Sequence, residues 1–153
     1  MKRAVYSRFE RVGIEKNQLI FEGLSPRSEY LAAYNRVDIA LSPFPYGGGT
    51  TSVEGLWMGV PVIVIRGNHF LSHLGESIAH NAGLSNWIAS DEDEYVTKAI
   101  EFSSNLDDLA ALRSRLRGQV VSSPLFDAKR FANQFENALR EMWERSKEGT
   151  HSH

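Results

Sequence analysis

Short apolar runs recur along the chain, separated by longer stretches whose apolar residues are spaced three and four apart. The second spacing places apolar side chains on one face of a helix, whereas a short unbroken run is typical of a buried strand. The run from Val62 to Ile65 has no polar alternation, as expected of a parallel strand covered on both faces. The sequence therefore predicts alternating strands and helices, with strands at residues 19–21, 39–41, 62–65 and 87–89.

Capping residues, glycines and prolines bound the predicted helices. Ser25 followed by Pro26 is typical of a helix start. The hydroxyl and acids of residues 90–93 suit the N-terminus of a later helix, and Asp127 suits that of the last helix. The helices are predicted at about residues 1–12, 25–35, 51–58, 70–82, 91–102, 106–121 and 127–143.

The apolar faces of the later helices predict which side chains pack into the core. The last helix has an apolar stripe rich in aromatic residues, which we interpret in the same way. The side chains predicted to face inward are Leu71, Leu74, Ile78 and Ala82; Val96, Ala99, Ile100 and Phe102; Leu109, Leu112, Leu116 and Val120; and Phe131, Phe135, Leu139, Met142 and Trp143.

The stretch from Val37 to Arg66 combines several of these signals. A predicted strand ends at two prolines, which cannot donate to a ladder, and three glycines follow at residues 47–49. Glycine can adopt positive φ and lets a ligand approach the main chain. Two threonines then open a helix that leads into the next strand. Such a unit places the helix N-terminus at the carboxyl edge of a parallel sheet, where α/β proteins bind phosphates.

The residues of this loop leave two interpretations open. The glycines match neither the dinucleotide-binding fingerprint nor the P-loop, so their spacing alone favours phosphate binding and a tight turn equally. Thr51 and Glu54 have the spacing of a capping box, in which a hydroxyl and a carboxylate satisfy free N–H groups at the start of a helix. In that interpretation Thr50 and Thr51 are helix caps.

Two separate strings of residues resemble one enzyme family. DIALSPFPYGGGTTSVEGLWMGVPVIVIRG and SSPLFDAKRFANQFENALREMW are similar to the O-linked N-acetylglucosamine transferase family, which includes the plant SPINDLY-like proteins. The resemblance covers residues 19–143. It implies an α/β fold, a three-layer Rossmann-like domain with a small parallel sheet, equivalent to the C-terminal half of a GT-B glycosyltransferase. We expect one nucleotide-sugar-binding domain over residues 1–146, without its N-terminal partner half, and a polar tail at 147–153.

The resemblance also implies a nucleotide-sugar site. Family members contact the diphosphate at the positions of Gly48, Gly49, Thr50 and Thr51. The position of Glu54 holds a carboxylate that accepts hydrogen bonds from the ribose hydroxyls. For Glu54 the ribose role and the capping-box role remain equally open, and they exclude each other geometrically.

Relatives place further contacts to the uracil and the phosphates at Ser25, Arg27 and Tyr30. For these residues the structural explanation is the stronger one, with Ser25 as a helix cap and Arg27 as a solvated charge. Tyr30 and Gly49 stand where the animal enzymes have histidines. The resemblance therefore implies diphosphate binding and leaves the specificity for base and sugar open.

The implied activity is inverting transfer of a sugar from a UDP-sugar, expected to be UDP-N-acetylglucosamine, to a protein hydroxyl. The catalytic base is expected outside this chain, in the absent half or in a companion polypeptide, so the chain alone is expected to be inactive. The alternatives are a non-catalytic nucleotide-binding or protein-interaction domain, or a structural remnant without a ligand. Self-association into a homo-oligomer is expected through residues 19–21 or 135–143.

Composition narrows the partners. With 153 residues, 42% hydrophobic and 24% charged, the chain resembles an ordinary globular domain. A net charge of −2 gives no electrostatic reason to expect nucleic acid or a membrane surface. The absence of cysteine excludes disulfides, and we expect a cytoplasmic location. His69, His73 and Glu76 could share a helical face, but the HExxH order is absent. The resemblance implies a family that needs no metal, so neither a metal nor another cofactor is expected.

Overall fold

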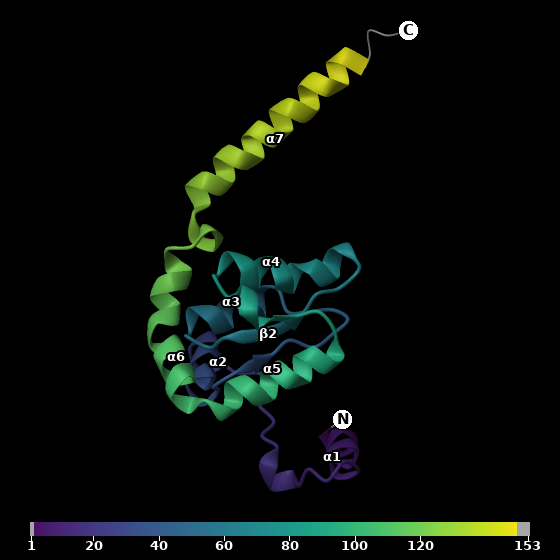
Figure 1. The fold of residues 1–153 in the computed structure, drawn as a ribbon, viewed down its shortest axis with the longest axis vertical. Helices are drawn as coiled ribbons and strands as arrows, with labels where there is room; N and C mark the ends of the chain where they lie inside the picture. Colours follow the sequence, from purple (N-terminus) through teal and green to yellow (C-terminus); the bar gives the residue numbers. More distant parts are fainter. Residues whose placement is uncertain (1, 150–153) are drawn as a thin grey trace. The chain divides into compact units, whose positions relative to one another are not determined.

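The structure is a computed structural model that describes residues 2–149 (Figure 1). The chain divides between Ala32 and Ala33 into two compact units. The first contains α1 (Lys2–Glu10), the short 3₁₀ turn η1 (Lys16–Gln18) and most of α2 (Arg27–Ala33). The second begins with the turn η2 (Tyr34–Arg36) and contains the sheet and the remaining helices.

The first unit confirms its predicted helix but not its predicted strand. The chain leaves α1 through Gly13, whose φ of 83° is left-handed, and Tyr6 packs edge-on against Phe21 with ring centroids 4.8 Å apart. The strand predicted at residues 19–21 is wrong, because these residues form no regular structure and Ile20 is 78% exposed. A strand needs a neighbour for its N–H and C=O groups. The described part of this unit contains no other strand.

Three short parallel strands form the sheet of the second unit. They are β1 (Ala40–Leu41), β2 (Val62–Ile65) and β3 (Ile88–Ala89), in the order β1-β2-β3. Ala40 is in register with Val62, and Val64 with Ile88. The unbroken apolar run of β2 is explained by this central position, since Val62, Ile63 and Val64 are all buried.

Helices cover both faces of this sheet. Figure 1 shows β2 between α4 (His73–Asn81) and α5 (Glu92–Ser104), and both helices contact this strand. α3 (Thr50–Trp57) also packs on β2 and against α6 (Leu106–Val121). Along the chain, the short turn η3 (Phe70–Ser72) precedes α4 and the turn η4 (Ser85–Trp87) follows it. The turn η5 (Pro124–Phe126) precedes α7 (Ala128–Gly149). The predicted α/β class with a small parallel sheet is therefore confirmed.

The core confirms the predicted face of α6 and corrects two other helices. Leu109, Leu116 and Val120 are buried, as predicted. In α4 the helix begins only at His73, so the predicted Leu71 and Leu74 are exposed and the buried side chains come from its later turns. In α5 the predicted Val96 and Ile100 are exposed, because the face that packs on the sheet is rotated by one residue. The buried or partly buried side chains of these two helices and of the turn after α4 are Ile78, Ala79, Ala82, Tyr95, Ala99 and Phe102.

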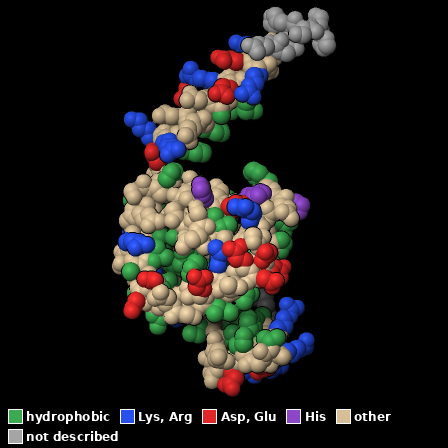
Figure 2. Space-filling view, viewed as in Figure 1, with side chains coloured by type: hydrophobic (Ala, Val, Ile, Leu, Met, Phe, Trp, Pro, Cys, Tyr) green, Lys and Arg blue, Asp and Glu red, His purple; other side chains and the backbone are tan. Residues whose placement is uncertain are grey.

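The apolar stripe of α7 is not part of this core, contrary to the prediction. All side chains described for this helix are exposed, Phe131 and Trp143 by more than 60%. Figure 2 shows hydrophobic side chains along one side of α7. Amphipathic spacing identifies the apolar face of a helix, but it does not identify what that face packs against.

Candidate functional site

The predicted site lies where β1 and β2 end. Ser42 directly follows β1 and Arg66 directly follows β2, so both lie at the carboxyl edge of the sheet. The loop from Ser42 to Gly49 crosses this edge and leads into α3. Because the carboxyl ends of parallel strands face the N-termini of the helices that follow them, the loop and the first turn of α3 share one edge.

Two buried serines fix the conformation of this loop. Ser42 Oγ accepts a hydrogen bond from Gly48 N at 3.1 Å, and Ser52 Oγ donates to Gly48 O at 2.8 Å. Both serines are only 6% exposed. Tyr95 reaches the same loop from α5 and donates its hydroxyl to Ser42 O at 3.3 Å, and burial raises the pKa of this hydroxyl. The loop is thus held in place by residues of its own unit.

The central glycine of the loop is required by close packing. A Cβ at Gly48 would lie 2.5 Å from Thr51 Oγ1 and 2.8 Å from Ser52 Oγ, closer than real Cβ contacts. The sequence suggested positive φ as a second reason for glycine. Gly47, Gly48 and Gly49 do not adopt it, and the left-handed glycines within the described residues are Gly13, Gly59 and Gly83.

The first turn of α3 has no side-chain cap. The helix begins at Thr50 and its N-cap residue is Gly49, which has no side chain to accept from the free N–H groups. The predicted capping box of Thr51 and Glu54 is therefore wrong, because Thr51 lies inside the helix. The exposed hydroxyls of Thr50 and Thr51 form no hydrogen bond with any residue in the described part of the chain. This helix end thus offers free N–H groups, two hydroxyls and a positive dipole end.

A hollow of about 160 Å³ opens beside this helix end. Tyr34 stands at its border and donates its hydroxyl to Thr51 O at 3.2 Å. The residues that line the hollow come from η2, β1, the glycine loop, α3 and the start of β2, and they include Tyr34, Leu41, Ser42, Gly48, Thr51 and Ser52. Two residues of the predicted site, Gly48 and Thr51, therefore meet at one cavity, and Gly49 and Thr50 lie between them in the sequence.

The remaining predicted site residues are Glu54 in the second unit and Ser25, Arg27 and Tyr30 in the first. Glu54 is half-buried, one turn further along α3. Ser25, Arg27 and Tyr30 belong to the first unit, where α2 begins at Arg27 and Tyr30 N donates to Pro26 O at 3.0 Å.

A second polar cluster occupies the same edge of the sheet. Glu76 lies between His73, with 2.8 Å from Nδ1 to Oε2, and Arg66, with 2.7 Å from Nε to Oε1. The hydrogen bond from His73 and the contacts with Arg66 lower the pKa of the Glu76 carboxyl, against the opposing effect of burial. Figure 2 shows histidine side chains gathered over α4. The sequence related His73 and Glu76 by helical spacing, but it could not identify Arg66, which reaches them across the fold.

These groups are not arranged as a metal centre. Among residues 2–149, no three histidine, aspartate or glutamate side chains come together as ligands for an ion. Within the same range, no helix is both long and apolar enough to cross a lipid bilayer.

The fold and its sheet edge define the class of protein. An α/β unit with a small parallel sheet and a glycine loop before a helix is the architecture of the C-terminal half of a GT-B glycosyltransferase. The profile of one such group, glycosyl transferase family 41, matches residues 2–135. The chain belongs to this family.

Relatives and a solved structure agree with this assignment. The probable UDP-N-acetylglucosamine–peptide N-acetylglucosaminyltransferase SPINDLY of Solanum lycopersicum is 35% identical over 150 residues, which are 97% of this chain and 16% of the relative. The UDP-N-acetylglucosamine–peptide N-acetylglucosaminyltransferase of Caenorhabditis elegans is 26% identical over 90% of this chain and 12% of its own.

The structure of a mutant O-GlcNAc transferase from Thermobaculum terrenum superposes on the fold with a TM-score of 0.89. It is 33% identical, and the match covers 97% of this chain and 28% of that chain. The chain thus spans about a sixth of the length of the SPINDLY relative and little more than a quarter of the solved chain.

Proposed function

We propose that this chain is the donor-binding part of an inverting glycosyltransferase that uses a UDP-sugar, with UDP-N-acetylglucosamine as the expected donor and a protein hydroxyl as the acceptor. The observation that carries the proposal is the uncapped start of α3, where the hydroxyls of Thr50 and Thr51 stand beside a hollow. The names of the relatives support the choice of donor, since both contain UDP-N-acetylglucosamine.

The diphosphate would be held by the segment from Gly48 to Thr51. Sugar transfer leaves the diphosphate with increasing negative charge, which N–H groups, hydroxyls and a helix dipole stabilise when they are already in position. The bonds from Ser42 and Ser52 to Gly48 fix this segment in the ligand-free chain. Little reorganisation would therefore be needed as the charge develops.

The nucleoside would be bound by the other residues of the predicted site. The carboxylate of Glu54 suits the two hydroxyls of a ribose, because it can accept two hydrogen bonds. The alternative role of Glu54 in a capping box with Thr51 does not apply, because α3 begins at Thr50 and its N-cap residue is Gly49. Ser25, Arg27 and Tyr30 are proposed to contact the uracil and the phosphates. The proposal requires no metal and no further cofactor.

Titration of the purified chain with UDP tests the phosphate site. Thr51→Val removes one hydroxyl, and losing a hydrogen bond to a charged group costs about 1.5–3 kcal/mol. We therefore expect binding to weaken about tenfold or more by isothermal titration calorimetry.

Thr97→Val is the matched control, since Thr97 is an exposed helical threonine whose hydroxyl donates to Asp93 O. It should leave UDP binding unchanged. Unchanged binding by folded Thr51→Val protein would reject the phosphate site. Failure of the unmodified chain to bind UDP or UDP-N-acetylglucosamine would instead favour a structural or protein-interaction domain.

A further inference from the structure

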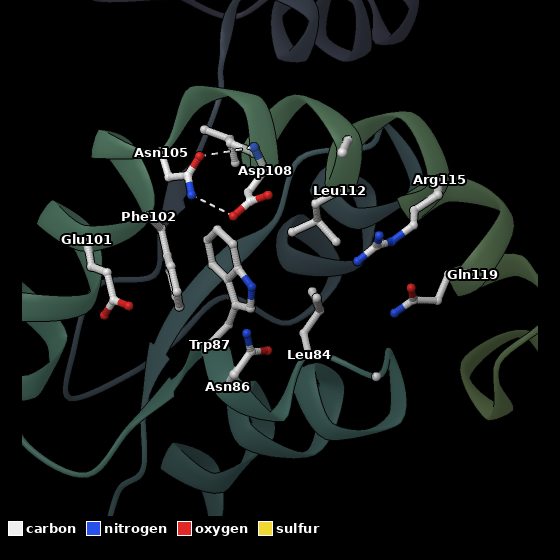
Figure 3. Close-up of a pocket in the computed structure, with 13 residues that line it drawn as sticks. Leu84, Asn86, Trp87, Glu101, Phe102, Asn105, Asp108, Leu112, Arg115 and Gln119 are labelled. Carbon is white, nitrogen blue, oxygen red and sulfur yellow. Dashed lines mark hydrogen bonds between the residues drawn. The ribbon is translucent and has the colours of Figure 1, made fainter.

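A larger hollow, of about 370 Å³, lies at the other edge of the sheet. Trp87 lines it and directly precedes β3, so this hollow opens at the amino edge, whereas the glycine loop follows β1 at the carboxyl edge. Its walls come from the segment before β3, the end of α5 and one face of α6 (Figure 3). Because the two hollows open at opposite edges of the sheet, this one is separate from the proposed donor site. Its volume falls within the usual range of small-ligand sites.

One stripe of α6 presents a charge of each sign to this hollow. Asp108, Leu112, Arg115 and Gln119 are spaced at i, i+4, i+7 and i+11, and all four line it. At about 1.5 Å of rise per residue, the carboxylate and the guanidinium are separated by about 10 Å along the helix. An apolar patch of Leu84 and Leu112 lies between Asp108 and Arg115 in Figure 3.

The polar groups of this stripe retain unused hydrogen-bonding capacity. Asp108 Oδ2 accepts from Asn105 Nδ2 at 2.5 Å, so its other oxygen is left for a ligand. Gln119 Nε2 donates to Ala82 O at 2.6 Å, which leaves the amide oxygen. Arg115 has no hydrogen bond or ion pair with any residue between 2 and 149.

A buried tryptophan adds a donor to the same wall. Trp87 is 3% exposed and stacks on Phe102 with ring centroids 4.2 Å apart. Its indole N–H has no hydrogen-bond partner among the residues that the structure describes. Among these residues no side-chain nitrogen or oxygen is both fully buried and without a partner, so this N–H keeps some contact with solvent. In Figure 3 the nitrogen edge of the ring faces the side of the hollow where Leu84 and Arg115 lie. Because this N–H has no partner and reaches solvent at the hollow, it is available to donate to a ligand that carries an acceptor.

We propose that this hollow binds a short peptide segment of about three residues with the pattern basic, apolar, acidic. The first and third Cα atoms of such a segment are at most about 7 Å apart, and the long side chains of a lysine and a glutamate cover the rest of the distance to the two charges on α6. The acidic group would accept from Arg115 and from Trp87 N–H, the apolar side chain would cover Leu84 and Leu112, and the basic group would face Asp108. Glu101, which also lines the hollow, adds a second negative charge for the basic group.

Nuclear magnetic resonance of the indole N–H groups tests this site. The chain has three tryptophans, and Trp57→Phe and Trp143→Phe identify the Trp87 signal by elimination. The probe is N-acetyl-Lys-Leu-Glu-amide, which should shift the Trp87 signal saturably and leave the other two unchanged. Arg115→Gln should weaken this binding about three- to tenfold, because one exposed charge-assisted bond is lost.

Arg117→Gln is the control, since it makes the same charge change on the same helix and its guanidinium lies over the ring of Trp57, 4.8 Å from the centroid. It should not change the affinity for the peptide. N-acetyl-Glu-Leu-Glu-amide and N-acetyl-Lys-Leu-Lys-amide should bind more weakly than the mixed peptide. The proposal is overturned if the mixed peptide leaves the Trp87 signal unmoved, if Arg115→Gln binds normally, or if all three peptides bind equally.

Discussion

Gly48 is the residue on which the geometry of the carboxyl edge depends most directly. Gly48→Ala would place a methyl group against Thr51 Oγ1 and the buried Ser52 Oγ, which is itself bonded to Gly48 O. We expect a loss of about 1–3 kcal/mol in the free energy of unfolding, the usual cost of overpacking. Urea denaturation measures it.

Gly118→Ala provides the comparison for this substitution. Gly118 lies inside α6, and a Cβ there would meet no atom within 4 Å. The substitution should stabilise the chain by about 0.5–1 kcal/mol, because glycine is unfavourable within a helix. An equal loss of stability in both variants would show that the contacts at Gly48 are not responsible.

The sequence predicted correctly that the glycine loop allows close approach, but not what approaches. At Gly48 the absent side chain makes room for Thr51 and Ser52 of the same chain. A glycine cluster looks the same in sequence whether the space is taken by a ligand or by a neighbouring side chain. The capping box failed for a similar reason, since its spacing is present but the helix begins one residue before Thr51.

Substitution of Glu54 distinguishes a contact with the ribose from a contact with the phosphates. If its carboxylate accepts from the ribose hydroxyls, Glu54→Gln should weaken the binding of UDP about threefold to tenfold and leave pyrophosphate binding unchanged. Competition calorimetry with the two ligands measures the difference. Glu144→Gln, which makes the same change on exposed α7, should affect neither ligand. Equal weakening of UDP and pyrophosphate would contradict the ribose assignment.

At the scale of elements, the start of α5 is predicted to make stability depend on pH. Glu94 accepts from the hydroxyl and from the main-chain N–H of Ser90, both at 2.7 Å, and pairs with Lys98. These contacts lower the pKa of Glu94 from 4.5 to about 2, the Ser90 hydroxyl contributing most. A lowered pKa in the folded state stabilises the fold above the pKa of the unfolded chain. This contribution is lost as the pH falls from about 4.5 to about 2.

Glu94→Gln should therefore melt at a lower temperature than the unmodified chain at pH 7, and the difference should shrink as the pH falls below 4.5. Circular dichroism melts at several pH values measure it. Glu92→Gln, in the same helical turn, should show a smaller difference, because none of the described residues is placed to bond the Glu92 side chain. A constant deficit for Glu94→Gln across this range would contradict the assignment.

Elements with local signals could be predicted, and those that depend on distant partners could not. Asp127 accepts from a main-chain N–H three residues on, as predicted, and within the predicted run of residues 90–93 Asp91 does the same. The central strand followed from its unbroken apolar run. The strand at residues 19–21 failed because pairing is decided by a neighbouring strand. The burial of α7 failed because its spacing indicates a face and not a partner. The hollow beside Trp87 was missed because its walls come from three separate segments.

At the scale of the whole molecule, the fold and the family could be predicted from the sequence because two long strings of residues carry the resemblance. The sequence does not identify an acceptor site, and the chain spans about a sixth of the SPINDLY relative. A transferase must bind an acceptor opposite the donor as well as the donor itself. Binding of the donor and transfer of the sugar can therefore be tested separately.

The final prediction is that this chain binds its donor but does not transfer sugar by itself. Inversion requires the acceptor hydroxyl to lose its proton as it attacks, so a base must lie within hydrogen-bond reach of that hydroxyl. At the carboxyl edge, Glu76 is already engaged by Arg66 and His73, and Glu54 is proposed to contact the ribose. Positioning of two reactants accounts for about 7–11 kcal/mol of barrier reduction, and the proposed site holds one of them.

Incubation of the purified chain with sugar-labelled UDP-N-acetylglucosamine and acceptor peptides measures this directly. We expect no labelled peptide from a preparation that binds UDP in the calorimeter, and at most slow hydrolysis of the donor. The binding measurement is the essential control, because an inactive chain that also fails to bind would not show whether a catalytic base is present. Transfer at an ordinary enzymatic rate of about 1 s⁻¹ or faster, abolished by Thr51→Val, would mean that this chain contains both the base and the acceptor site.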